Sequence, residues 1–260
     1  MRVRRLGWAG VELEASGQRL VIDYVRDISP MFSEWKPGDG LIAPSGEVSA
    51  ALVTHLHRDH TDAAALADVL TPGAPVLRPA PDRADVNDNL LTQLAEGELV
   101  ESRLTTDLVG EWATRAIGPF RVTALPAVDG FGDPQLSWVV EADGHRIFHG
   151  GDTLFHGYWW HITRRFESLD AVFLPANGAV VDAPLRQPSS QLEAVLDPKQ
   201  AAEAAKILGA RHAVPIHYAS EQPNKVGHYV EVDDPAGKFR AHTGRHAHVL
   251  TVGEWLDLAA

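Results

Sequence analysis

The stretch "ALVTHLHRDHTD" (residues 51–62) constrains the fold of this chain more than any other. The apolar run "VSAALVT" that leads into it predicts a buried strand, and "TDAAALADVL" after it has the spacing of a helix that Thr61 or Asp62 can cap. Between the two lie three histidines and an aspartate: His55, His57, Asp59 and His60. Open α/β sheets place ligand sites where a strand ends and a helix begins, so this order predicts a functional site.

The residue types of this cluster favour a metal site. Alternate residues of an extended segment point the same way, so His55 and His57 are predicted to face together, with Asp59 and His60 directed elsewhere. Such a loop offers two ions different ligands. Imidazole and carboxylate suit zinc first, with manganese or iron as alternatives. The simpler interpretation is a polar loop that caps a helix, but three histidines at this spacing favour metal.

Composition excludes several function classes. The chain has no cysteine, so disulfides and thiolate ligands are ruled out, and any metal must be held by histidine and carboxylate. A net charge of -12 argues against a nucleic-acid or anionic-membrane partner, which needs clustered Lys and Arg. No signal-peptide pattern or membrane-length apolar run is visible. We expect a cytoplasmic protein with a small-molecule substrate; a homo-oligomer is left open.

The rest of the sequence predicts a layered α/β protein. Residues 3–25 predict a hairpin with its turn at "ASGQ", and three strands follow in "FRVTALPAV" and "LSWVVEADGHRIFHGGD". "LDAVFLPANG" and "HAVPIHY" predict two more strands. "DPKQAAEAAKILGA" predicts a helix with Asp197 at the N-cap and Gly209 past its end, and a short helix is predicted near residues 90–95. No repeat or linker is visible, so residues 1–260 are predicted to form a single domain.

Further metal ligands are predicted at the ends of three of these strands. "LPAVDG" presents Asp129, "IFHGGDT" presents Asp152 and "AVPIHY" presents His217. The two glycines before Asp152 allow a sharp turn where a Cβ would clash. Each residue alone could be a turn or core residue. Together with the histidine cluster they favour a shared site.

The motifs "HLHRDH", "GGDT" and "PIHY", in this order, resemble the metallo-β-lactamase fold superfamily. The opening "RRLGWAGVELEASGQRLVIDY" and "FLPANG" resemble its ascorbate-6-phosphate lactonase-like and N-acylphosphatidylethanolamine phospholipase D-like branches. The resemblance implies a four-layer αββα sandwich of two mixed sheets with helices on the outer faces. It also implies a metal-dependent hydrolase that directs a metal-bound hydroxide at a small lactone, ester or phosphodiester.

The same resemblance implies a ligand set for two divalent ions. One ion would take His55, His57 and a histidine of a third segment, and the other would take Asp59, His60 and His217. Asp152 would bridge the two ions. Asp59 would also orient the hydroxide or accept its proton. Asn177 in "PANG" and Tyr218 beside His217 are predicted to contact substrate, with turn and packing roles as the alternatives.

The third segment departs from the family, because it has Asp129 where relatives have histidine. Asp129 itself can be a ligand, which is the favoured interpretation, or it can be too short and leave a single metal. The third alternative is replacement by His145, His149, His156 or His161. Loss of the ligand would give a degenerate member that binds metal or ligand without efficient hydrolysis. Trp8, a second departure, is expected to pack at the rim of the site.

Two other stretches are rich in histidine or aromatic residues. "RHAHV" contains His246-x-His248 in a segment that is predicted to be β-like, and it has no carboxylate neighbour, so a metal role is not favoured. "YWWHITRRF" predicts a packed helix, with a substrate-lining role for its aromatic residues as the alternative.

Overall fold

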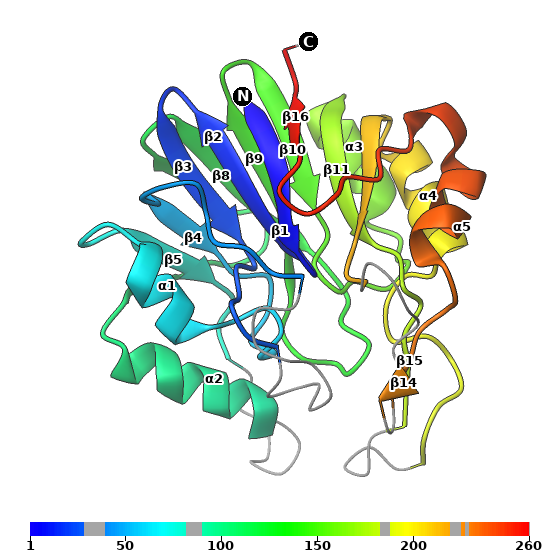
Figure 1. Ribbon diagram of the computed structural model, residues 1–260, viewed down its shortest axis with the longest axis horizontal. Helices are drawn as coiled ribbons and strands as arrows, with labels where there is room; N and C mark the ends of the chain where they lie inside the picture. The colour runs from blue at the N-terminus through cyan, green and yellow to red at the C-terminus, as the bar shows by residue number, and fades with distance from the viewer. Residues whose placement is uncertain (29–39, 82–89, 183–187, 219–224, 227–228, 260) are drawn as a thin grey trace.

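Two β-sheets pack face to face, and helices cover both outer faces (Figure 1). The computed structural model describes residues 1–28, 40–81, 90–182, 188–218, 225–226 and 229–259. The first sheet has seven strands in the order β16-β1-β2-β3-β4-β5-β6. Their bounds are β1 (Arg2–Gly7), β2 (Gly10–Ala15), β3 (Gln18–Ile22), β4 (Ala50–Leu52), β5 (Pro75–Arg78), β6 (Thr105–Leu108) and β16 (Trp255–Asp257).

The second sheet has six strands in the order β13-β11-β10-β9-β8-β7, and a small third sheet has the order β12-β15-β14. The bounds are β7 (Thr114–Ile117), β8 (Phe120–Pro126), β9 (Leu136–Ala142), β10 (His145–His149), β11 (Leu169–Pro175), β12 (Val180–Val181), β13 (Ala210–Ile216), β14 (Lys225–Val226) and β15 (Tyr229–Val230).

Both large sheets are mixed. In the first, β1, β2 and β3 form an antiparallel meander with the turn at Ser16–Gly17, and β3 to β6 then run parallel. In the second, β7 to β10 are antiparallel, whereas β10, β11 and β13 are parallel. The β11–β13 register pairs Pro175 with Ile216, so the segments that hold Asn177 and His217 leave the sheet side by side.

Within the described residues, five α-helices complete the layers: α1 (Ala63–Val69), α2 (Leu90–Glu101), α3 (Trp159–Phe166), α4 (Pro198–Ile207) and α5 (Pro235–Thr243). Apolar residues of α1 and α2 pack on the outer face of the first sheet, and those of α3, α4 and α5 pack on the second. The side chain of Asp62 caps α1 by accepting from the Ala65 N–H. Asp197 caps α4 in a capping box with Gln200, as the sequence predicts.

A third apolar cluster fills the space between the sheets. Leu13, Leu20 and Ile22 from the first sheet meet Trp138 and Phe173 from the second, and all are fully buried. With the two outer clusters this gives the four αββα layers that the resemblance implies, so the predicted fold class is confirmed.

Some local predictions were wrong or incomplete. The helix near residues 90–95 runs on to Glu101. The "RHAHV" segment is not a strand, because Gly244–His246 form a 3-10 helix (η1) and Ala247 makes only an isolated bridge to Ala213. Proline and glycine breaks without periodicity predict a loop at residues 28–46, and this stretch lies largely outside the described residues.

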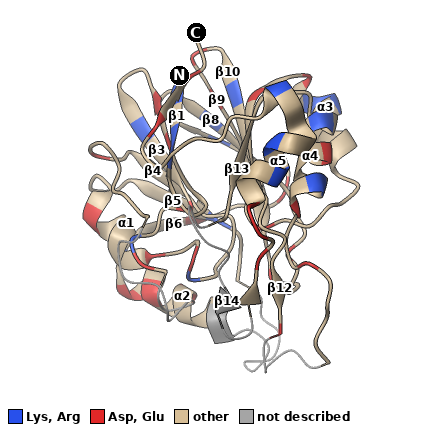
Figure 2. Ribbon diagram, turned by 45° about the vertical axis from the view of Figure 1, so that its right-hand side comes forward, with Lys and Arg blue, Asp and Glu red and all other residues tan. Residues whose placement is uncertain are grey.

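The charged residues are unevenly distributed over the outer helices. Acidic residues lie on α1 and α2, whereas Lys and Arg lie on α3 and α5 (Figure 2). Among the described residues, no helix is both long and apolar enough to cross a membrane.

Candidate metal centre

The structure brings all seven predicted ligands into two groups of buried side chains. The first group consists of His55, His57 and Asp129, and the second group consists of Asp59, His60, Asp152 and His217. Within each group the potential ligand atoms lie within 4.8 Å of one another. The partition follows the ligand sets that the resemblance implies, with Asp129 in the third-segment position.

The loop after β4 positions four of these residues. It turns tightly at its centre, because the His57 carbonyl accepts from the backbone N–H groups of His60 (3.0 Å) and Thr61 (2.9 Å). The Thr61 hydroxyl donates back to the His55 carbonyl at 2.9 Å. This turn separates His55 and His57 from Asp59 and His60, so one short segment serves both groups.

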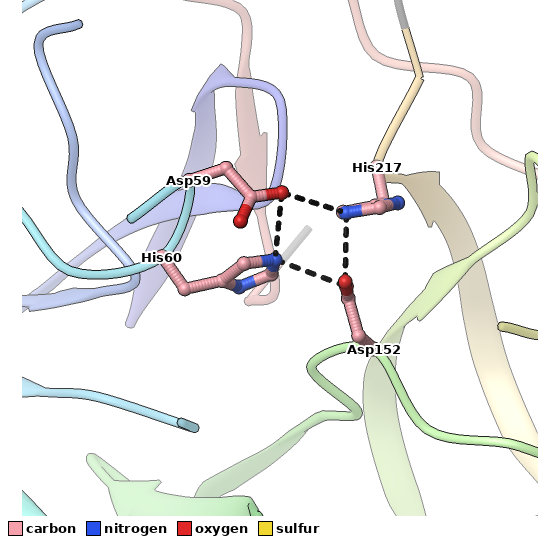
Figure 3. A group of neighbouring side chains, drawn as sticks. All are labelled: Asp59, His60, Asp152 and His217. Carbon is pink, nitrogen blue, oxygen red and sulfur yellow. Dashed lines mark ion pairs between the residues drawn. The ribbon is translucent and has the colours of Figure 1, made fainter. Parts of the chain in front are cut away.

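The second group is centred on Asp152, which follows β10 (Figure 3). Its carboxylate oxygens lie 2.9 Å from Nε2 of His217 and 3.0 Å from Nε2 of His60. Asp59 lies 3.4 Å from the same His217 nitrogen. Asp152 also lies 4.0 Å from Nε2 of His55, so it is the residue that links the two groups.

Glycine at position 151 is required for this arrangement. Its φ is +62°, and a Cβ there would approach the side chain of Thr54 to 2.8 Å. The prediction that glycine permits a turn here, where a Cβ would clash, is therefore confirmed at Gly151.

The first group is completed by a turn after β8. Oδ1 of Asp129 accepts from the N–H groups of Phe131 (2.8 Å) and Asp133 (3.1 Å). Asp129 also forms an isolated antiparallel bridge with Thr153, the neighbour of Asp152. The backbone of the third segment is thus fixed both within its own turn and against the loop of the second group.

Oxygen atoms of neighbouring residues orient the histidine rings. Asp23 lies 2.7 Å from Nδ1 of His60, and the Thr54 hydroxyl lies 2.9 Å from Nδ1 of His55. Thr54 also donates to Asp23 at 2.7 Å. Asp23 was missed in the sequence, although it follows the apolar "RLVI" strand as Asp152 and His217 follow theirs.

Trp8 is not at the rim, which corrects the expectation. It is buried, its indole Nε1–H donates to Asp59 at 3.1 Å, and its ring lies 4.3 Å from that of His217. Its carbonyl also accepts from the His217 N–H. Trp8, Asp23 and His217 all have positive φ angles (45°, 48° and 59°), a strained conformation that clusters at functional sites.

The charges of the second group are strongly coupled. Burial opposes the charged form of His217, but Asp152 and Asp59 raise the pKa of its ring to about 9. Burial likewise opposes a charged Asp152, but His217 and His60 hold the pKa of its carboxyl well below the usual range. The metal-free site is therefore stabilised as a cluster of ion pairs, and a metal ion must displace protons from the histidines.

His55 and Asp129 differ from that cluster. Burial lowers the pKa of His55 well below the usual value, so this ring is neutral and its lone pair is ready for a ligand bond. Burial also raises the pKa of Asp129. Burial therefore makes the charged form of each side chain unfavourable. A bound cation would offset this cost for the Asp129 carboxylate.

The donor atoms themselves fit metal ions. Several of them are buried and have no hydrogen-bond partner among the described residues: Nε2 of His55, His60 and His217, and single oxygens of Asp59 and Asp152. The short contacts between His60 and Asp152 do not have hydrogen-bond geometry, although they satisfy the ion-pair distance. Buried polar atoms are rarely left this way in proteins, and unpaired nitrogens and oxygens aimed at one another are typical of a metal site.

None of the histidines considered as replacements for the third ligand joins either group, within the described part of the chain. His149 is committed to backbone, because Nε2 donates to the Ala9 carbonyl and Nδ1 accepts from the Gly151 N–H. The His156 ring stacks on Trp159 at 4.1 Å. His145 faces Asp170, and His161 stands beside Arg164.

The two predicted substrate residues are held by other contacts. Tyr218 is buried, and the Arg5 guanidinium lies over its ring at 4.0 Å and donates to its carbonyl. Asn177 donates to the Tyr229 hydroxyl (2.5 Å) and to Glu231 (3.1 Å), while its buried Oδ1 has no partner in the described part of the chain. Contact with substrate stays a prediction for both.

Tyr229 and Glu231 were not singled out in the sequence. The Tyr229 hydroxyl donates to Glu231 at 2.9 Å, and both side chains are buried. Burial, Glu231 and the carboxylates of Asp152 and Asp59 raise the pKa of Tyr229, so this polar cluster adjoins the second group. No motif marks these residues: Tyr229 belongs to the two-residue strand β15, and Glu231 follows it.

The remaining histidine and aromatic stretches have structural contacts. His212 and His248 pair at 2.8 Å between ring nitrogens, and His246 is exposed. In α3 the ring of Trp159 is buried, whereas Trp160 is half exposed. These positions agree with the packing interpretations that were favoured.

Comparison with known proteins identifies the family. The model described as "Beta-lactamase superfamily domain" matches residues 18–218, which include all seven predicted ligands. The chain belongs to the beta-lactamase superfamily. The superfamily resemblance is thereby confirmed, whereas its two narrower branches remain resemblances.

Relatives within the superfamily include a UPF0173 metal-dependent hydrolase from Rubrobacter xylanophilus. It is 26% identical over 223 residues, which cover 84% of this chain and 82% of the relative. Among solved structures, the isothiocyanate hydrolase from Delia radicum gut bacteria has a TM-score of 0.69 at 16% identity and covers 99% and 98% of the two chains. CmlA, a diiron beta-hydroxylase from Streptomyces venezuelae, has a TM-score of 0.72 at 16% identity, over 98% of this chain and 53% of CmlA. At these identities the solved structures show the fold alone.

Proposed function

We propose that this protein is a metal-dependent hydrolase whose two adjacent sites each hold one divalent ion. The observation that carries the proposal is the set of seven buried His and Asp side chains, in which ligand atoms without hydrogen-bond partners converge. His55, His57 and Asp129 would hold one ion; Asp59, His60 and His217 would hold the other, with Asp152 between them. Zinc is the favoured metal, and the additional carboxylate of Asp129 makes manganese or iron the alternatives.

Divalent ions in these sites would supply a nucleophilic water at neutral pH and would polarise the bond that is attacked. The protein's own residues provide the rest of the chemistry. Asp59 has one oxygen fixed by the indole of Trp8, while its buried Oδ1 has no hydrogen-bond partner within the residues that the structure describes. We propose that this oxygen orients the attacking water or accepts its proton.

The charge of the centre favours a neutral substrate. Two divalent ions would bring four positive charges, against the five aspartates that are buried in the described part of the chain: Asp23, Asp59, Asp129, Asp133 and Asp152. Within the described residues, the only buried Arg or Lys side chains are Arg5, which is engaged by Tyr218, and Arg78, which pairs with Glu96. A lactone or ester therefore suits the site better than a phosphodiester, whose anionic phosphate would add negative charge.

Metal analysis and turnover together test the proposal. Protein purified without chelator should contain up to two transition-metal ions per chain by elemental analysis. It should hydrolyse members of a panel of lactones and carboxylic esters, and bis-p-nitrophenyl phosphate more slowly. Dialysis against chelator should abolish turnover, and added zinc or manganese should restore it. A protein that folds but takes up no metal, or that binds metal without chelator-sensitive turnover across the panel, would contradict the proposal.

A further inference from the structure

Asp133 is a buried carboxylate next to the first group that no ligand motif includes. Its Oδ2 lies 2.8 Å from Nε2 of His57, and both side chains are at most 5% exposed. A hydrogen bond between buried partners of this kind fixes the plane of the imidazole and the nitrogen that carries its proton. When Nε2–H donates to Asp133, Nδ1 is the nitrogen that remains for a ligand bond.

The other two histidines of the motif are held in the opposite way. His55 and His60 are each contacted at Nδ1, by Thr54 and by Asp23, and no described residue hydrogen-bonds to their buried Nε2 atoms. His57 is contacted at Nε2 instead. Each of the three rings is therefore held by an oxygen of a different residue, and Asp133 holds the ring of His57.

Asp133 is also tied to the third-segment ligand. Its backbone N–H donates to Oδ1 of Asp129, the same oxygen that accepts from Phe131. One turn of five residues thus supplies a potential ligand at its first position and the support of another ligand at its fifth. The Phe131 ring lies edge-on to His57 at 5.8 Å, so the turn contacts that imidazole on a second side.

We propose that Asp133 is a positioning residue that presents Nδ1 of His57 to the ion held with His55 and Asp129, and that the turn it shares with Asp129 sets both ligands in place together. The inference rests on the proposed metal centre. It predicts that the turn at Asp129 is rigid. The Asp129 carboxylate can accept two backbone N–H groups at once, whereas a histidine ring at this position could not accept both.

Cobalt binding tests the role directly. Metal-free wild type, Asp133→Ala and Asp133→Asn are titrated with Co(II) against a competing chelator, and the visible absorption of the bound ions is recorded. Asp107→Ala is the matched control, because it removes a carboxylate that pairs with Arg115 on β6 and β7, away from both groups. Removal of a carboxylate that supports a metal-binding histidine typically lowers affinity by about 10–100-fold.

The expected result is selective. Asp133→Ala should lose about 10–100-fold in affinity for one Co(II) ion and change its absorption, while the other ion stays within about threefold of wild type. Asp133→Asn should recover most of that loss, because its amide oxygen still accepts from Nε2–H. Asp107→Ala should match wild type. Wild-type affinity and spectrum in Asp133→Ala would overturn the role of Asp133, and equal loss at both sites would show a general structural effect and overturn it too.

A measurement on the wild type covers the case in which Asp133→Ala does not fold. In zinc-loaded, ¹⁵N-histidine-labelled protein, two-bond ¹H–¹⁵N spectra should show His57 with its proton on Nε2. A proton on Nδ1 would overturn the proposal. Wild-type protein that takes up no cobalt or zinc would overturn the proposed function and this inference together, whereas normal uptake with an unaffected Asp133→Ala variant would overturn this inference alone.

Discussion

Substitutions of Asp129 can separate the two roles of its carboxylate, which are to close the turn and to bind a metal ion. Its Oδ1 closes the turn by accepting from Phe131 (2.8 Å) and Asp133 (3.1 Å), which leaves Oδ2 as the oxygen for a metal ion. Asp129→Asn keeps an oxygen that can accept both N–H groups but removes the charge. Asp129→Ala removes both the acceptor and the charge. The two variants should therefore differ in stability and agree in their loss of metal.

The magnitudes follow from the contacts. Each hydrogen bond to a charged acceptor contributes about 1.5–3 kcal/mol and a neutral one about 1 kcal/mol. Because burial already disfavours the charged carboxylate and raises its pKa, removal of the charge returns part of that cost. Asp129→Asn should therefore lower the free energy of unfolding of metal-free protein by about 1 kcal/mol or less. Asp129→Ala should lower it by about 2–4 kcal/mol, because two N–H groups lose their acceptor.

Urea unfolding in the presence of chelator measures the stability, and elemental analysis after equilibration with zinc measures the stoichiometry. Both variants should retain one ion instead of two. Equal stability of the Asn and Ala variants would show that the turn does not depend on Oδ1. Two ions with unchanged affinity in Asp129→Asn would show that Asp129 is not a ligand, and the carboxylate would then have only its role in the turn.

Three further predictions concern Asp152, Gly151 and His156. Asp152→Asn weakens the link between the groups and should reduce the affinity for both ions by more than the roughly 10–100-fold expected for a supporting residue, as measured by competition with a chelator. Gly151→Ala should destabilise the protein by about 1–3 kcal/mol, because the new methyl group would meet Thr54, whereas Gly157→Ala, with open space around it, should be near neutral in the same urea titration. Burial lowers the pKa of His156 to about 4, below the unfolded value of about 6.5, so its contribution is present above pH 6.5 and is lost as pH falls toward 4. Urea unfolding should therefore show His156→Gln losing less stability than wild type between pH 7 and pH 4.5, and parallel losses would contradict this account.

The parts of the fold that the sequence predicts well are those with local signals. Asp62 and Asp197 cap their helices as expected, since capping depends on residues only three positions apart. The helix at residues 90–101 was predicted too short, because its apolar spacing is weak and its burial of Ala95 and Leu99 depends on the distant first sheet. Tertiary contacts of this kind leave no pattern within a single segment.

The residues of the candidate site also fall into those with a local sequence signal and those that depend on tertiary contacts. Residues that follow an apolar strand directly, such as Asp152 and His217, can be found from the sequence because strand ends of parallel sheets share an edge. Asp133, Tyr229 and Glu231 lie in a turn or a short strand, and only the three-dimensional structure places them beside the cluster. Trp8 departs from the motif of its relatives and was expected to pack at the rim, whereas its indole is buried and donates to Asp59.

Each group of predicted ligands takes residues from both β-sheets. His55, His57, Asp59 and His60 follow a strand of the first sheet, and Asp129, Asp152 and His217 follow strands of the second. Each bound ion would therefore cross-link the two halves of the sandwich. In a chain that has no cysteine, no disulfide can have this role. Since a ligand that binds only the folded state stabilises it by mass action, the free metal concentration would set how often the halves separate. Metal supply would then govern the lifetime of the protein against proteolysis as well as its activity.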